Sequence, residues 1–407
     1  MRVVSARWLV PIERPPIADG AVALADDGAV LAAGARAELR AAFPDAPEER
    51  AEGVLMPGLV NAHSHLEIAA HADSVPGGQG FFAWATLLMR ARTGDTADKL
   101  RAPAANAAAA AVALGTAVIG DVGSSLVAAP GIASAGLAGV LFHELFGSRD
   151  MATGDALADA ARERAASDAA GPWPERLGYV PAPHAPYSAD PALLARIFAA
   201  AAAAGRATSI HVAEDEDEIA LLRDGSGRWP ALLAGMGVDP ATRVPRKSPV
   251  AYIASLGAFQ TETPPLLVHM VHASADDRRI AREAGATVVL CPRSNLHIGG
   301  RLPDVGALLT DGLPIAIGTD SLASTPDLSL WAELATLAAH FPAVPAARWL
   351  EAATRGGARA LGLRGSGVLA PGARPGVLDV LVEDVAAPLE SLVRDPTPTL
   401  RWVAPPS

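Results

Sequence analysis

The 407-residue sequence has a single cysteine, Cys291, which excludes an internal disulfide framework and predicts a cytoplasmic protein. It has no long hydrophobic run of the membrane-spanning kind, because its longest apolar tracts, such as residues 104–113, are alanine-rich and favour helices in water. The first residues lack the apolar core and cleavage site of a signal peptide. Basic residues are also fewer than acidic ones, and the resulting net charge of −11 argues against nucleic acid as a partner. We therefore expect a small-molecule substrate and neither a nucleic-acid nor a membrane partner.

Hydrophobic residues make up 50% of the chain, and its length suits a barrel with a smaller domain beside it. After residue 56, short apolar runs alternate with alanine-rich helical stretches, which is typical of βα units. Strands are predicted over residues 58–63, 116–123, 139–146, 177–184, 207–214, 266–272, 286–295 and 314–320. Helices are predicted over residues 96–114, 155–166, 191–205, 275–285 and 305–312. Eight such units predict an α/β fold, a (β/α)₈ TIM-like barrel, over residues 57–363.

The two ends of the chain follow a different pattern. Residues 1–56 show short strands with turn signals, and residues 364–407 begin with glycine and proline punctuation followed by a strand-like run. We expect these two segments to pair into one small β-sandwich-like domain.

Two histidines close together open the candidate site. His63 and His65 stand at i and i+2 where the first predicted barrel strand ends, so both imidazoles project from one face if the strand continues. Converging imidazoles suit Zn²⁺, although two polar residues at a strand-to-loop corner are an ordinary alternative.

More residues of the same chemistry follow other predicted strands. His211 is followed at i+3 by Glu214, His269 ends the sixth strand, and Asp320 ends the eighth. Any one of them can be explained as a structural cap. Together with the first pair they meet at one barrel face, where catalytic residues collect, and so they predict an active site.

The motifs GLVNAHSHLE, HVAE, VHMVH and GTDSLAS resemble the deaminase and chlorohydrolase branch of the amidohydrolase superfamily, and the resemblance covers nearly the whole chain. It implies a mononuclear site whose metal ligands are His63, His65, His211 and Asp320. It also implies that the catalytic residues are Glu214, His269 and Asp320.

The lysine content supports a single metal. Binuclear members of the superfamily bridge two metals with a carboxylated lysine or a similar acidic group on the fourth strand. This chain has only Lys99 and Lys247, neither of which ends a predicted strand, and its fourth strand ends in APHAPYS. We expect one divalent metal, Zn²⁺, with Fe²⁺ as the alternative.

The chemistry follows from the groups. Zn²⁺ lowers the pKa of a bound water to about 7, and Asp320 can take the proton. Glu214 is suited to protonating a ring nitrogen of the substrate, and His269 to hydrogen-bonding the developing oxyanion. Because amide hydrolysis needs no ring protonation, the HxxE pattern favours an aminated heteroaromatic ring.

Other residues are predicted to contact the substrate. These are His184, expected across the barrel from the metal at a ribose hydroxyl, Arg293 beside Asn295 at the seventh strand, and Glu67 and Trp84 after the first strand. Structural alternatives are a loop cap for His184, an Arg-Asn turn for Arg293, and helix packing for Trp84.

The motifs HSHLE, APHAPYS and CPRSNLHIGG are most similar to those of enzymes that deaminate adenine nucleosides, including 6-aminodeoxyfutalosine of menaquinone biosynthesis. Alternatives are S-adenosylhomocysteine or methylthioadenosine, guanine, a cytosine-like base, a triazine, or a non-catalytic scaffold. The sequence leaves open a homodimer in which a second subunit completes the pocket.

Overall fold

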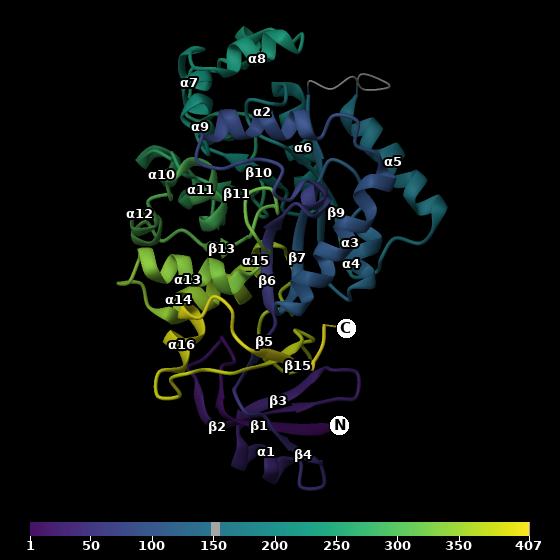
Figure 1. The fold of residues 1–407 in the computed structure, drawn as a ribbon, viewed down its shortest axis with the longest axis vertical. Helices are drawn as coiled ribbons and strands as arrows, with labels where there is room; N and C mark the ends of the chain where they lie inside the picture. Colours follow the sequence, from purple (N-terminus) through teal and green to yellow (C-terminus); the bar gives the residue numbers. More distant parts are fainter. Residues whose placement is uncertain (148–154, 407) are drawn as a thin grey trace.

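Eight parallel strands build the centre of the molecule in the computed structural model, which describes residues 1–147 and 155–406 (Figure 1). One four-stranded sheet comprises β6 (Leu59–Ser64), β7 (Thr116–Gly123), β8 (Ala138–Leu145) and β9 (Leu177–Pro183). The other comprises β10 (Ser209–Val212), β11 (Leu266–His269), β12 (Val288–Leu290) and β13 (Ile315–Ile317). Each strand lies within one residue of its predicted range or inside it, so the predicted barrel strands are confirmed.

Two seams close the sheets into a barrel. At one seam the His211 amide donates to the His184 carbonyl over 3.0 Å. At the other, the amides of Thr319 and Asp320 both donate to the His63 carbonyl, over 3.0 and 3.1 Å. The second seam therefore brings the end of the eighth barrel strand against the end of the first.

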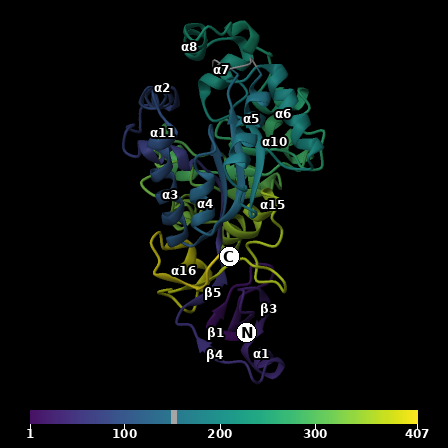
Figure 2. The ribbon, with the colours of Figure 1, turned by 90° about the vertical axis from the view of Figure 1, so that its right-hand side faces the viewer.

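Helices surround the barrel (Figures 1 and 2). Apart from α11 and the helices of two insertions, which are described below, the helices between the strands are α3 (Ala97–Ala113), α4 (Ala129–Ser134), α5 (Ala156–Ala170), α6 (Pro191–Ala203), α10 (Ala275–Glu283) and α12 (Val305–Thr310). After β13 come α13 (Leu330–His340), α14 (Ala346–Glu351), η3 (Ala352–Gly356) and α15 (Gly357–Ala360). None of the helices in the described ranges is long and apolar enough to cross a membrane.

Two insertions stand over the carboxyl ends of the strands, at the top of Figure 1. The first follows β6 and contains η1 (Leu66–His71) and α2 (Phe81–Ala91). The second follows β10 and contains α7 (Glu216–Asp224), α8 (Trp229–Gly235), η2 (Pro240–Arg243) and α9 (Pro249–Ser255). Their position makes them candidates for the walls of a substrate pocket.

The predicted seventh strand is too long. β12 ends at Leu290, and Pro292 opens helix α11 (Pro292–Gly299). Proline suits the first turn of a helix because its φ is already helical and it needs no amide partner there. Arg293 and Asn295 therefore lie on a helix and not on a strand end.

Both ends of the chain enter one seven-stranded sheet below the barrel (Figure 1). Its strands are β1 (Arg2–Leu9), β2 (Ile17–Leu24), β3 (Val30–Ala35), β4 (Glu48–Arg50), β5 (Val54–Pro57), β14 (Val377–Val380) and β15 (Leu400–Ala404), and helix α1 (Arg36–Ala42) packs on β2 and β3. Helix α16 (Pro388–Arg394) connects β14 to β15 and packs against α13 and α14 of the barrel. β5 and β14 pair antiparallel, with Met56 opposite Leu378. The barrel with a terminal β domain is thus confirmed, while the exact domain limits remain a prediction.

Replacing Gly318 tests how closely β13 and β6 approach each other at the second seam. A Cβ at this position would lie 2.7 Å from both Cβ and O of His63, and both are atoms that cannot move freely. We expect Gly318→Ala to lower the free energy of unfolding by roughly 1–3 kcal/mol, measured by chemical denaturation. Gly365→Ala is the control, because a Cβ there meets nothing within 4 Å. Equal stability of the two variants would contradict this view of the seam.

Candidate metal centre and active site

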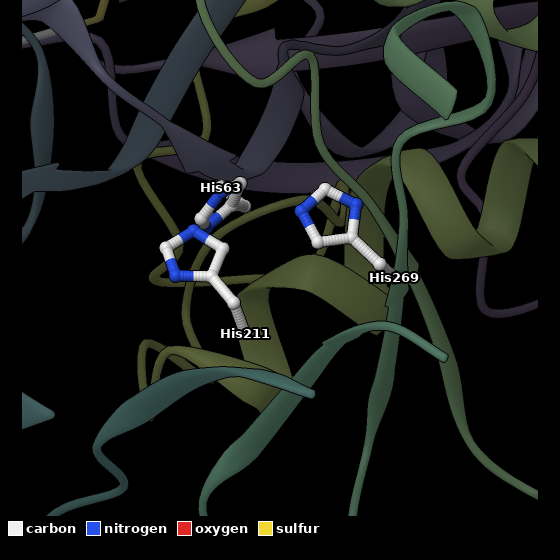
Figure 3. A group of neighbouring side chains, drawn as sticks. All are labelled: His63, His211 and His269. Carbon is white, nitrogen blue, oxygen red and sulfur yellow. The ribbon is translucent and has the colours of Figure 1, made fainter. Parts of the chain in front are cut away.

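The four predicted metal ligands converge at the carboxyl ends of the strands. Nε2 of His65 lies 3.2 Å from Nε2 of His211. Oδ1 of Asp320 lies 3.7 Å from Nε2 of His65 and 3.9 Å from Nε2 of His63. Figure 3 shows the rings of His63 and His211 beside that of His269. The sequence prediction that these residues share one site therefore has direct geometric support.

His63 shows that the cluster suits a metal. Its side chain is fully buried, and neither ring nitrogen has a hydrogen-bond partner among the described residues. A buried polar group without a partner is costly, and a metal ion would provide one. Burial, then the neighbouring histidines, holds the pKa of His63 well below its ordinary value. The ring is therefore neutral, as a ligand must be.

The other candidate ligands are also neutral or are oriented by hydrogen bonds. Burial is the main reason that the pKa of His65 and that of His211 each fall to about 4. Nδ1 of His211 contacts the His184 carbonyl at 2.9 Å, which turns Nε2 toward the cluster. Oδ2 of Asp320 accepts from Ser294 and Ser324 at 2.5 and 3.2 Å, so Oδ1 is the oxygen nearer the histidines. Three imidazoles and one carboxylate fit a Zn²⁺ site.

The backbone is strained where it delivers these groups. Ala213, His269, Met270 and Asp320 all have positive φ, at 53°, 76°, 54° and 60°. Non-glycine residues rarely adopt this conformation, and it gathers at functional sites. Each of the four follows or ends a barrel strand. The chain therefore turns sharply at the site in three of the motifs singled out in the sequence.

Glu214 and His269 stand beside the ligand cluster. Oε1 of Glu214 lies 3.5 Å from Nε2 of His269. Burial, then the charges of Asp320, Glu218 and Asp215, raises the pKa of Glu214 well above its usual value. Burial lowers the pKa of His269 to about 3. The raised pKa favours the protonated form of Glu214, and the imidazole of His269 is neutral, a combination suited to an acid beside a hydrogen-bonding group.

Glu218 supports Glu214, and the sequence analysis did not single it out. Its buried carboxylate accepts from the amides of Ala213 and Glu214 over 3.1 and 3.0 Å. Only its spacing of four residues from Glu214 could have indicated this role. The contact fixes the strained turn that carries the acid.

A cavity of about 650 Å³ opens over the cluster. Its lining includes His65, His211, Glu214, His269 and Asp320. Aromatic residues make up only 4% of the chain, yet five of them line this cavity: Phe81, Trp84, Phe146, Tyr187 and Trp229. Flat apolar walls over a polar floor suit an aromatic substrate.

His184 lines the cavity, but it is not across the barrel from the metal ligands. Its ring centroid lies 5.1 Å from that of His211, because β9 and β10 are neighbours in the barrel. Its Nδ1 hydrogen-bonds with Ser188 at 2.7 Å, and its ring stacks on Phe146 at 4.4 Å. The predicted position of His184, across the barrel from the metal, was therefore wrong. A substrate that contacts His184 would do so close to the candidate metal ligands.

Trp84 and Glu67 also line the cavity, each with a structural role as well. Nε1 of Trp84 donates to the Ala323 carbonyl at 3.2 Å. The Glu67 carboxylate accepts from amide and hydroxyl groups of both Ser124 and Ser125, over 2.7–3.1 Å, and pairs with Arg92. These bonds fasten the first insertion to the end of β7.

Arg293 is not among the residues that line the cavity. Its guanidinium contacts Asp327 at 2.7 Å and lies 3.8 Å from Glu333. Its amide donates to Glu333 over 2.9 Å. This geometry supports the structural alternative for Arg293, because α11 turns its side chain toward α13.

Comparison with known proteins gives consistent results. Residues 54–383 match the model of the Amidohydrolase family. The aminodeoxyfutalosine deaminase of Deinococcus radiodurans is 35% identical over 82% of this chain and 80% of its own length. The 5-methylthioadenosine/S-adenosylhomocysteine deaminase of Desulfitobacterium hafniense is 27% identical over 83% of this chain and 74% of its own length.

A solved structure shows the same fold. The adenosine deaminase from Xanthomonas campestris, a structure with bound zinc, matches with a TM-score of 0.80 at 23% identity, over 100% of this chain and 92% of that one.

We expect one equivalent of divalent metal per chain. His63 belongs to two groups of closely spaced donors, one with His65 and Asp320 and one with His211 and His269, which favours a single ion between them. Elemental analysis after mild dialysis measures the content. His211→Ala should lose most of the metal, because three ligands leave the site open. His340→Ala is the control, since His340 lies on exposed α13 surface and bonds the Thr336 carbonyl. Two equivalents in the unmodified protein would contradict a mononuclear site.

Proposed function

The chain belongs to the amidohydrolase family, and from that premise we propose that it removes the amino group of an adenine nucleoside by hydrolysis, with 6-aminodeoxyfutalosine as the leading substrate. It is a metal-dependent hydrolase that acts on C–N bonds. The single observation that carries the proposal is the position of Glu214, whose side chain is 9% exposed and lies 3.5 Å from His269 beside the ligand cluster.

The metal that we propose is a single Zn²⁺ held by His63, His65, His211 and Asp320. Its donor set is the one that zinc prefers, and the related structure from Xanthomonas campestris contains zinc. When bound, the metal would supply an activated water molecule. The remaining chemistry belongs to the side chains of this protein.

Glu214 has the first of these tasks. It donates its proton to a ring nitrogen of the substrate, which makes the adjacent carbon electrophilic. Asp320 accepts a proton from the attacking water, and Nε2–H of His269 donates to the oxygen that gains negative charge. Glu214, now a carboxylate, takes the proton of the new hydroxyl group and passes it to the departing amino group. The C–N bond breaks, ammonia leaves, and the proton held by Asp320 returns to Glu214. The 3.5 Å between Glu214 and His269 allows both to act on one reacting carbon.

The cavity supports a nucleoside better than a small base. A volume of about 650 Å³ exceeds the need of a single ring, and its walls are aromatic. We propose that His184 and Trp84 contact the substrate, with His184 near the reacting ring. Glu67 contributes to the wall that Arg92 and the two serines stabilise. Deamination of 6-aminodeoxyfutalosine would place the enzyme in menaquinone biosynthesis.

Replacing Glu214 separates the proton shuttle from metal binding. Glu214→Gln is nearly isosteric but cannot cycle a proton, so we expect retained metal and a kcat reduced at least about 100-fold. The control is Glu262→Gln, because Glu262 is exposed and does not line the cavity. Substantial activity of Glu214→Gln would remove Glu214 from the proton transfer, and loss of metal would make it a ligand.

A substrate panel tests the proposed function itself. Ammonia release should be measured for 6-aminodeoxyfutalosine, methylthioadenosine, S-adenosylhomocysteine, adenosine, guanine, cytosine and an aminotriazine. We expect the highest kcat/KM for 6-aminodeoxyfutalosine. A higher value for methylthioadenosine would replace the leading substrate, and a higher value for a free base would overturn the nucleoside proposal. A protein without metal and without activity would be a scaffold.

A further inference from the structure

A second cavity, of about 800 Å³, lies beside the first. Phe81 and Glu214 line both cavities, so these two side chains stand between them. The inner end of the second cavity is at buried Asn295 and at Glu214, whose side chain is only 9% exposed. Its outer end is at Glu216 and Arg301, which are 78% and 60% exposed. The second cavity thus connects the surface with the acid of the active site.

The two cavities differ in chemistry. The second contains carboxylates and cations that are paired along its wall: Arg228 with Asp217 at 2.6 Å and Arg301 with Glu216 at 3.7 Å. Paired charges retain water, and of the five aromatic residues that line the first cavity only Phe81 also lines the second. The wall is therefore suited to small polar molecules.

The reaction creates a need for such a passage. Each turnover forms a C–O bond from one water molecule and breaks one C–N bond, and the departing nitrogen takes a proton and leaves as ammonia. The organic molecule meanwhile fills the aromatic cavity above the reacting carbon. We propose that the second cavity is the route by which ammonia leaves, and water enters, while the organic product still occupies the first cavity. The inference depends only on deamination and holds for any aminated ring.

Gly299 allows the route to be narrowed. It lines the second cavity but not the first, and a Cβ there meets no atom within 4 Å. Its φ is not in the positive range, so a larger side chain is not strained. Gly299→Phe should obstruct the passage, while Gly299→Ala should leave it open. Gly365→Phe is the matched control, because Gly365 has the same open surroundings and lines neither cavity.

The test measures kcat, KM and inhibition by ammonium chloride in all four proteins, with the best substrate of the panel. In the unmodified enzyme, ammonium should reduce kcat at saturating substrate, because it reaches Glu214 with the first cavity filled. In Gly299→Phe, slower release of ammonia should lower kcat at least threefold, while kcat/KM stays within twofold and the metal content is unchanged. The Gly299→Ala and Gly365→Phe enzymes should match the unmodified one.

A step that follows cleavage of the C–N bond lowers kcat without changing kcat/KM, so these two values separate release from substrate binding and chemistry. Ammonium inhibition that is purely competitive with substrate in the unmodified enzyme would overturn the proposal. So would a kcat in Gly299→Phe equal to that of Gly365→Phe.

Discussion

Closure of the barrel between β6 and β13 is the interaction on which the site depends. The His63 carbonyl accepts from the amides of Thr319 and Asp320, and the Asn61 side chain donates to the Thr319 hydroxyl at 2.7 Å. These bonds place Asp320, the last of the four proposed metal ligands in the sequence, against His63 and His65. Gly318 leaves the space in which the strands approach. Without this seam the ligands would be on opposite edges of an open sheet, too far apart to share an ion.

Burial acts on the two kinds of site residue in opposite directions. It lowers the pKa of the histidines and raises that of Glu214, because each charged form loses its hydration. Both effects favour neutral groups. The three histidines proposed as metal ligands are therefore neutral, as ligands must be, and the protonated form of Glu214 is favoured. Burial thus favours both the neutral histidines that metal binding needs and the protonated carboxyl group that proton donation needs.

The sequence predicted the features that depend on local pattern. Apolar runs located all eight strands, and the motifs located His63, His65, His211, Glu214, His269 and Asp320, because these residues end strands that meet at one barrel face. It was less informative about side chains whose partners are distant in the chain. The bonds of Glu67 to Ser124 and Ser125, and of Arg293 to Asp327, depend on packing that no local pattern records. The proximity of His184 to His211 follows from the order of strands around the barrel.

The pairing of β5 with β14 has a consequence for synthesis of the chain. β5 precedes the first barrel strand, and β14 follows the last. When the ribosome has made β5, its partner is still more than three hundred residues from completion. Until then one edge of the growing sheet exposes unsatisfied amides and carbonyls to other nascent chains. The edge of β5 is therefore covered only after the whole barrel has been synthesised, when β14 pairs with it.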